Sequence, residues 1–137
     1  MTVVYDLKKL KEVLDDTQTI AIVGLSKDEY KPSYRVAKYL KEKGYKIVPV
    51  NPNIEEVLGE KSYPNIASIP FDIDLVNIFR RMDKVYPFIE QAVEKKVKYI
   101  WLPFAVFSNA GLNLAKENNI FMIQNRCVME EHRNLFK

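Results

Sequence analysis

The chain has 137 residues, of which 47% are hydrophobic and 28% are charged, a balance typical of a folded globular protein and not of a disordered one. The formal net charge is +3, from 21 basic and 18 acidic residues that are interspersed along the sequence. This charge is too weak to predict a nucleic-acid partner, but it fits a protein that binds an anionic small molecule. The length predicts a single domain over residues 1–137.

Cys127 is the only cysteine, so an internal disulfide is excluded and no cysteine cluster with zinc spacing exists. The first sixteen residues are charged and contain no long apolar run, which argues against a signal peptide or a membrane span. We therefore expect a cytoplasmic protein with no membrane partner.

Apolar runs that predict strands alternate along the chain with segments of helical periodicity. In chain order the pattern predicts a helix (5–16), a strand (19–25), a helix from Pro32 or Ser33 to Gly44, a strand (45–50), a short edge strand (61–63), a strand (73–79), a helix after Asp83, a strand (97–102), a helix (109–118), a strand (120–123) and a short helix (128–135).

This alternation predicts an α/β fold, a Rossmann-like doubly wound sheet of mostly parallel strands with helices on both faces. In the first helix, Leu7, Leu10 and Leu14 fall on one face and predict its buried side. In such a sheet, ligands bind at the carboxyl ends of the strands, where the strand order reverses. The loops that follow the five main strands are therefore where we look for a site.

The loop after the first strand has the features of an anion site. Gly24 lets the backbone turn tightly, and a helix that starts just behind it presents unpaired N–H groups. Ser26 and Ser33 supply hydroxyl groups, and Lys31 and Arg35 add positive charge. These features predict a grip for a phosphate or a diphosphate, although an ordinary strand–helix turn with solvated charges has the same composition.

The same loop lacks the fingerprint of a nicotinamide dinucleotide site. That pattern needs G-x-G-x-x-G and an acidic residue after the second strand, whereas this loop has one glycine and the chain has Asn51 at the second place. The P-loop motif for nucleoside triphosphates is also absent from the sequence. The sequence therefore argues against a nicotinamide dinucleotide and against a P-loop nucleoside triphosphate as the ligand.

Two further loops carry residues suited to a nucleotide. Asn51 and Pro52 follow the second strand, where Asn51 either contacts a ribose or an adenine edge or simply forms a turn. Phe79, Arg80 and Arg81 end the third main strand. Arginine suits phosphate contacts and Phe79 can pack on a flat base, so we expect one or both arginines to face the crevice.

The loop after the fourth main strand is apolar. Trp101 is expected in the core, whereas Phe104, Val106 and Phe107 line a slot for part of a ligand or form a contact in a homodimer. The sequence leaves these two alternatives open.

The last loop carries Cys127 at the start of a helix, beside Arg126. A helix start and a nearby positive charge lower the pKa of a thiol, but a buried, inert cysteine is the expectation. His132, the only histidine, is expected on the exposed side of the last helix. The sequence yields no nucleophile–base arrangement and no paired carboxylates at these loops.

Taken together, the chain resembles the family of small stand-alone CoA-binding proteins, from about residue 17 to residue 135. The resemblance rests on Gly24-Leu25-Ser26, Lys31-Pro32-Ser33-Tyr34-Arg35-Val36-Ala37, Tyr39-Leu40, Gly44-Tyr45, Pro49-Val50-Asn51-Pro52, Leu58-Gly59-Glu60, Tyr63-Pro64, Val76, Phe79-Arg80, Trp101, Arg126-Cys127 and Glu130.

The resemblance implies a Rossmann-type fold and coenzyme A as the ligand. The family is similar to the CoA-binding domain of the succinyl-CoA synthetase α subunit and of NDP-forming acyl-CoA synthetases. By this resemblance the phosphates would be held by Gly24, Ser26, Lys31, Ser33 and Arg35, and the nucleotide cleft would be formed by Asn51, Pro52, Phe79 and Arg80.

Lys31 stands where family members commonly have arginine, Pro103 and Ala105 stand where they usually have glutamine and glycine, and Asn125 stands where aspartate is typical. The related ligases also need an active-site histidine in a second domain and an ATP-grasp module, which do not fit within 137 residues. We therefore expect a carrier, sensor or regulatory module that binds CoA. The alternatives are an enzyme that acts on CoA or acyl-CoA through Cys127, or a subunit of a ligase-like assembly.

Overall fold

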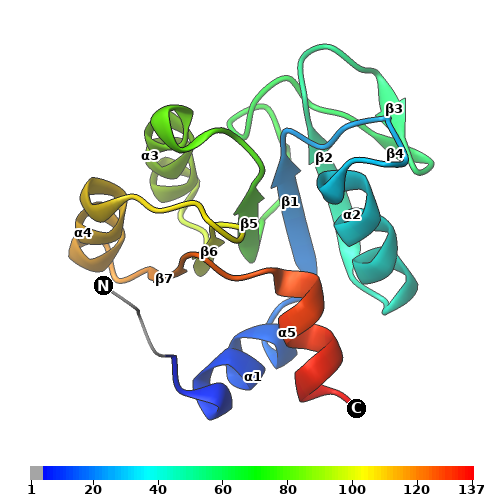
Figure 1. Ribbon diagram of the computed structural model, residues 1–137. Coiled ribbons are helices and arrows are strands. Elements are labelled where there is room, and N and C mark those ends of the chain that lie inside the picture. Colours follow the sequence, from blue (N-terminus) through cyan, green and yellow to red (C-terminus); the bar gives the residue numbers. More distant parts are fainter. Residues whose placement is uncertain (1–4) are drawn as a thin grey trace.

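The computed structural model describes residues 5–137 (Figure 1). In chain order its elements are α1 (Leu7–Asp15), β1 (Thr19–Val23), α2 (Pro32–Glu42), β2 (Lys46–Val50), β3 (Glu56–Val57), β4 (Glu60–Lys61), β5 (Leu75–Ile78), the 3-10 helix η1 (Met82–Lys84), α3 (Tyr86–Lys95), β6 (Tyr99–Trp101), α4 (Asn109–Glu117), β7 (Phe121–Ile123) and α5 (Val128–Leu135).

Within these residues the main sheet has five strands in the order β2-β1-β5-β6-β7, and every neighbouring pair is parallel. The chain moves outward from β1 to β2 and then returns to place β5 on the other side of β1. The strand order therefore reverses between β1 and β5, which is where an open α/β sheet binds ligands. The Rossmann-like prediction is confirmed.

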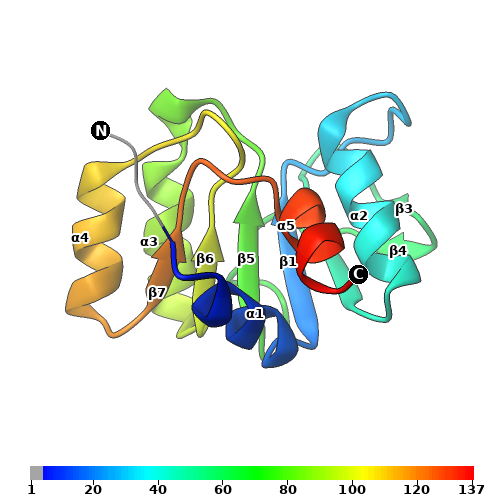
Figure 2. The same cartoon turned by 60° about the horizontal axis from the view of Figure 1, so that its bottom comes forward.

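The strands are buried on both faces because helices cover each side of the sheet. Ile20 and Ile22 of β1 pack in one core cluster with α1, α2 and α5, and Ala21 and Val23 pack in the other with α3 and α4. Figure 2 shows α1 and α5 in front of the strands. This period-two alternation explains why each strand appears in the sequence as a continuous apolar run.

The prediction of an edge strand at residues 61–63 is wrong, because among the described residues the main sheet has no such strand. Instead, β3 and β4 pair antiparallel as a small hairpin, and Leu58 and Gly59 form its turn with φ values of 55° and 75°, as a two-residue hairpin of this type requires. Tyr63, two residues after β4, meets the main sheet through an isolated parallel bridge to Val50.

Two side chains lie elsewhere than predicted. Leu7 is 62% exposed, because the stripe of α1 that faces the core is Leu10, Val13 and Leu14 and Leu7 lies outside it, on the first turn. His132 is buried at 7% exposure instead of solvated, since it lies four residues after the buried Val128 on the inward face of α5.

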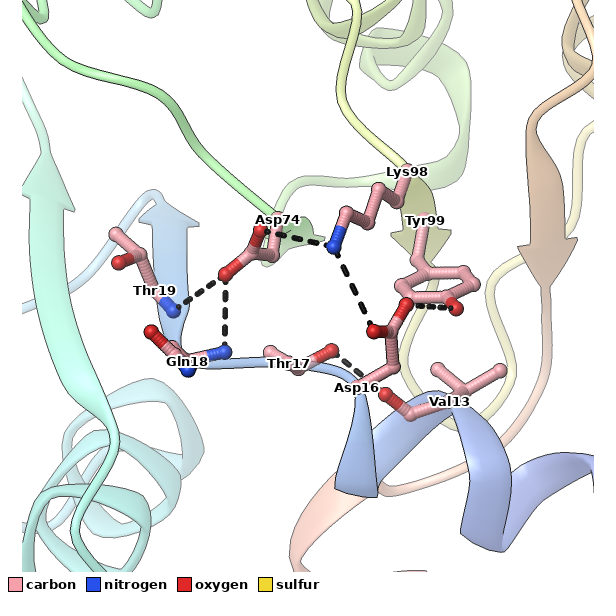
Figure 3. Close-up of polar contacts among 8 residues, drawn as sticks. All are labelled: Val13, Asp16, Thr17, Gln18, Thr19, Asp74, Lys98 and Tyr99. Carbon is pink, nitrogen blue, oxygen red and sulfur yellow. Dashed lines mark hydrogen bonds and ion pairs between the residues drawn. The ribbon is translucent and has the colours of Figure 1, made fainter.

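A polar network closes the amino end of the sheet (Figure 3). The Asp74 carboxylate accepts hydrogen bonds from the N–H groups of Gln18 (2.9 Å), just ahead of β1, and of Thr19 (3.0 Å), the first residue of β1. Lys98 forms ion pairs with both Asp74 and Asp16. The amino ends of β1, β5 and β6 are thereby held together, so the open loops lie at the opposite, carboxyl end.

No helix among residues 5–137 has both the length and the apolar character needed to cross a membrane.

Candidate functional site

A cavity of about 550 Å³ lies at the carboxyl ends of β1 and β5, between the first turns of α2 and α5. We call it the central cavity. Its lining comes from five separate loops and helix starts, and consists of Gly24, Lys31, Pro32, Ser33, Val36, Asn77, Phe79, Arg80, Arg81, Pro103, Phe104, Val106, Cys127 and Val128. The central cavity therefore lies where the strand order reverses, at the end of the sheet where the sequence analysis looked for a site.

Gly24 has φ +80° and lies directly against the end of β5. A Cβ at this position would overlap the carbonyl oxygen of Phe79 and lie 3.3 Å from Cδ of Arg80. The Gly24 N–H also donates to the carbonyl oxygen of Val50 (2.9 Å). Glycine is thus required by the close approach of two loops of the chain itself, in addition to any approach of a ligand.

The first turn of α2 forms one end of the central cavity. Pro32 occupies the first helical position, and no side chain among the described residues caps the helix. The Ser33 hydroxyl oxygen accepts from the N–H of Ser26 (3.1 Å), which ties the loop to the helix. Pro32 has no N–H, and the N–H of Tyr34 donates to the carbonyl oxygen of Lys31 (3.1 Å). Within the described residues this turn therefore offers an anion the N–H of Ser33, the partial positive charge of the helix start and the full charge of Lys31.

Both arginines after β5 line the central cavity, but they differ in their contacts. Arg81 forms an ion pair with Asp83 (2.9 Å) on the surface, which raises the pKa of Arg81 and lowers the pKa of Asp83. The guanidinium of Arg80 lies 5.1 Å from the ring centroid of Phe88. Arg80 also lines the neighbouring cavity, so it is the better-placed of the two cations for a ligand that spans both.

This neighbouring cavity, about 360 Å³, we call the polar cavity. It lies at the carboxyl ends of β1 and β2. Its lining consists of Val23, Gly24, Val50, Asn51, Pro52, Asn53, Pro64, Phe79, Arg80 and Phe88. Gly24, Phe79 and Arg80 line both cavities, so the two adjoin at these residues. A ligand lying over Gly24 would occupy both.

Asn51 lies in the polar cavity, and its side chain is used by the loop. Its Nδ2 donates to the carbonyl oxygen of Leu25 (3.0 Å) and its Oδ1 accepts from the N–H of Asn53 (2.9 Å). These bonds make Asn51 a turn residue that joins the loops after β1 and β2. Of the two interpretations left open by the sequence, the structure favours the turn, and contact with a nucleotide stays a prediction.

Asn77 is a site residue that the sequence analysis missed. It is fully buried, its Nδ2 donates to the carbonyl oxygen of Trp101 (3.0 Å), and its Oδ1 has no partner among the described residues. An unpaired buried acceptor is costly, so its place on the wall of the central cavity is informative. An asparagine inside the otherwise apolar strand IDLVNIF was the signal in the sequence.

Two of the nine predicted site residues lie outside the central and polar cavities. Arg35 lines a third cavity of about 400 Å³, the lateral cavity, with Pro32, Val36, Phe104, Cys127, Met129 and Glu130. Ser26 is absent from the lining of all three cavities, and its hydroxyl oxygen accepts from the N–H of Asp28 (3.0 Å). Pro32 and Val36 of α2 line both the central and the lateral cavities, whereas Lys31 lines the central one and Arg35 the lateral one.

The loops after β6 and β7 form the apolar end of the central cavity. Trp101 is fully buried and donates to the carbonyl oxygen of Arg126 (2.8 Å), as expected of a core residue. Phe104 is 74% exposed at the mouth, and Val106 lines the cavity. Phe107 is not in the lining, so only part of the predicted slot forms.

Cys127 is half-buried at the N-cap of α5, and it lines both the central and the lateral cavities. The positive charge expected beside it is engaged elsewhere, because the guanidinium of Arg126 contacts Glu131 (3.4 Å) and lies 5.5 Å from the ring centroid of Tyr5. Within residues 5–137 there is no group of three metal-ligating side chains. The central cavity combines the cations Lys31, Arg80 and Arg81 with the apolar side chains of Val36, Phe104 and Val106.

A protein-family model described as a CoA binding domain matches residues 18–133 of this chain. An uncharacterized protein of Bacillus subtilis, YneT, is 32% identical over 124 residues, which cover 90% of this chain and 92% of that protein. The ADP-forming acetate–CoA ligase of Methanocaldococcus jannaschii is 34% identical over 128 residues, and the chain spans only 18% of its length.

Solved structures agree with these sequence relatives. A hypothetical protein from Pyrococcus horikoshii has a TM-score of 0.94 and 33% identity, with both chains covered completely. The dinucleotide-forming acetyl-coenzyme A synthetase 1 of Ca. Korarchaeum cryptofilum, in complex with phosphate and ADP, has a TM-score of 0.75 and 27% identity over 83% of this chain and 27% of that one.

Proposed function

Because the chain belongs to the family of CoA-binding domains, we propose that it binds coenzyme A across the central and polar cavities and acts as a carrier, sensor or regulatory module. The observation that carries this proposal is the continuity of the two cavities at Gly24, Phe79 and Arg80. One ligand with an anionic centre, a polar nucleotide and an apolar arm matches this series of surfaces.

The fit can be followed part by part. The diphosphate is proposed to lie on the first turn of α2, with Lys31 on one side and Arg80 on the other. Both side chains can form charge-assisted hydrogen bonds to phosphate, which are stronger than neutral hydrogen bonds. The nucleotide is proposed for the polar cavity, with Pro52 and the Phe79 ring as its apolar contacts. The pantetheine arm then runs along the apolar end of the central cavity.

The amide groups of that arm suit Asn77. The arm carries two amide N–H donors and a hydroxyl group, and the Oδ1 of Asn77 is an acceptor without a partner among the described residues. Because Asn77 is fully buried, its amide would have to turn toward the cavity for a donor from the ligand to pair with this oxygen and remove the cost. This is an argument for an amide-containing ligand and against one that is purely apolar at this point.

Two observations keep other functions in view. Cys127 lines the central cavity, so an enzyme that uses its thiol on CoA or acyl-CoA is the first alternative. The ADP-forming ligases that resemble the chain are much longer than it, so a subunit of a ligase-like assembly is the second. Co-purification of a larger partner would favour the assembly, and a reactive Cys127 thiol would favour the enzyme.

The test is to identify the small molecules released from the purified protein by mass spectrometry, and then to compare CoA, dephospho-CoA, NAD and ATP by calorimetry. CoA is expected to be released and to bind most tightly. If NAD binds more tightly than CoA, the proposal is wrong.

The matched variants are Lys31→Ala and Lys27→Ala. Lys31 lines the central cavity, whereas Lys27 is an exposed lysine of the same loop outside the three cavities. Loss of a charge-assisted hydrogen bond to phosphate is worth about 2 kcal/mol, so Lys31→Ala is expected to weaken CoA binding by about thirtyfold. Lys27→Ala is expected to change it little. Arg35→Ala should fall between the two and lose its effect at high salt.

A further inference from the structure

The central and lateral cavities adjoin at one wall. Pro32 and Val36 of α2, Phe104 of the loop after β6, and Cys127 at the start of α5 line both cavities. The lateral cavity, about 400 Å³, therefore begins where the apolar end of the central cavity stops. A ligand that fills the central cavity therefore lies against the wall that it shares with the lateral one.

Phe104 forms the exposed part of this wall. Its side chain is 74% exposed although it lines two cavities, so it is covered little by the protein itself. The neighbouring Ala105 has φ +67°, and its N–H donates to the Oδ1 of Asn125 (2.7 Å), which fixes the loop backbone and leaves the ring outside. An apolar group lying across the wall would cover the Phe104 ring and gain hydrophobic stabilisation.

The chemistry of the lateral cavity favours an uncharged apolar occupant. Pro32, Val36, Phe104 and Met129 provide its apolar surface, and its only charged residues are Arg35 and Glu130, one of each sign. The two charges offset each other for any ligand group between them. Methionine adapts its shape to irregular apolar groups, so Met129 suits a flexible chain better than a rigid ring.

We propose that the lateral cavity holds an apolar acyl group carried as a thioester on the sulfur of CoA, with that sulfur at the Cys127–Phe104 wall. The proposal rests on the proposed CoA site, because the pantetheine arm ends in sulfur and runs along the central cavity toward this wall. The physiological ligand is then an acyl-CoA, and free CoA leaves the lateral cavity unfilled by ligand.

The experiment is a calorimetric comparison of CoA with acetyl-, butyryl-, hexanoyl- and octanoyl-CoA on the full chain. Each methylene that enters an apolar cavity is expected to tighten binding by up to about fourfold, until the cavity is filled. Met129→Gln is the test variant, because Met129 lines the lateral cavity and not the central or polar one. Met82→Gln is the control, since Met82 is an exposed methionine outside all three.

The inference predicts that Met129→Gln keeps the affinity for CoA and loses the gain with chain length, whereas Met82→Gln keeps both. If all the acyl-CoAs bind no more tightly than CoA, or if the gain survives in Met129→Gln, the acyl site is not the lateral cavity and the inference is overturned while CoA binding stands. If neither CoA nor any acyl-CoA binds, the proposed function itself fails.

Discussion

Gly24 illustrates how one residue serves both the fold and the site. Its positive φ turns the chain out of β1, and the missing Cβ leaves room for the carbonyl oxygen of Phe79. The loops after β1 and β5 therefore touch at the point where the central and polar cavities meet. Any side chain here would push the two loops apart and would also change the place where the two cavities meet.

Gly24→Ala is therefore expected to destabilise the protein strongly. A positive φ costs alanine about 1–2 kcal/mol, and the overlap with the Phe79 backbone adds about 1–3 kcal/mol. Urea unfolding measures the sum. Gly44→Ala is the control, because Gly44 also has a positive φ but a Cβ there would meet no heavy atom of the described residues within 4 Å. Equal losses in the two variants would show that the contact with Phe79 is unimportant.

At the scale of elements, α5 connects the site to the core on the face of the sheet that α1 and α2 also cover. Its first residues follow Cys127 at the cavity wall, and its inward face carries His132. The Nδ1 of His132 lies 2.9 Å from the Tyr39 hydroxyl of α2, and its ring stacks on Phe136 with centroids 4.6 Å apart. The position of α5 over α2 therefore depends on a histidine held among aromatic rings.

Burial lowers the pKa of His132 below its ordinary value of 6.5, the positive charge of Lys43 lowers it further, and Asp15 opposes the shift. Since the unfolded chain then takes up this proton first, the free energy of unfolding is expected to fall as the pH drops from about 6.5 toward the lowered pKa. Above pH 6.5 this group makes no difference.

The measurement is the urea midpoint at pH values on both sides of 6.5, compared between the natural chain and His132→Asn. Asparagine retains a polar group near the Tyr39 hydroxyl but does not titrate, so the variant should lose this part of the pH dependence. Identical pH profiles for the two chains would mean that His132 does not contribute to the acid sensitivity of the fold.

On the scale of the whole molecule, the two ends of the sheet differ in character. Asp74, Lys98 and Asp16 close the amino end with hydrogen bonds and ion pairs (Figure 3). At the carboxyl end, Tyr30 and Phe104 are 88% and 74% exposed on separate loops. Phe104 is one of the residues for which the sequence left a homodimer contact open, and its exposure leaves its ring available for such a contact.

We predict that the chain self-associates through this end and that Phe104→Ser weakens the association. Burial of Phe104 would remove a largely exposed apolar ring from water. Sedimentation equilibrium over a range of concentrations measures the effect. Leu7→Ser is the control, because Leu7 is an exposed apolar residue on α1, away from the carboxyl end. A monomer at every concentration would contradict the prediction.

The sequence by itself determined the order of elements, the parallel sheet and the end of the sheet where the cavities lie. Local periodicity encodes helices and strands, and parallel strands bring their carboxyl ends to one edge. For that reason Gly24, Lys31, Ser33, Phe79 and Arg80, which were predicted from two separate loops of the chain, line one cavity.

Only the tertiary structure decided how the side chains divide among the cavities. Arg35 faces the lateral cavity, Asn51 bonds to its own loops, Asn77 presents an unpaired oxygen and His132 is buried. Each outcome depends on a neighbour distant in sequence: α5 beside α2, or the Trp101 carbonyl beside Asn77. Periodicity fixes which face of an element is apolar, but packing between distant segments fixes which polar groups find partners and which are left for a ligand.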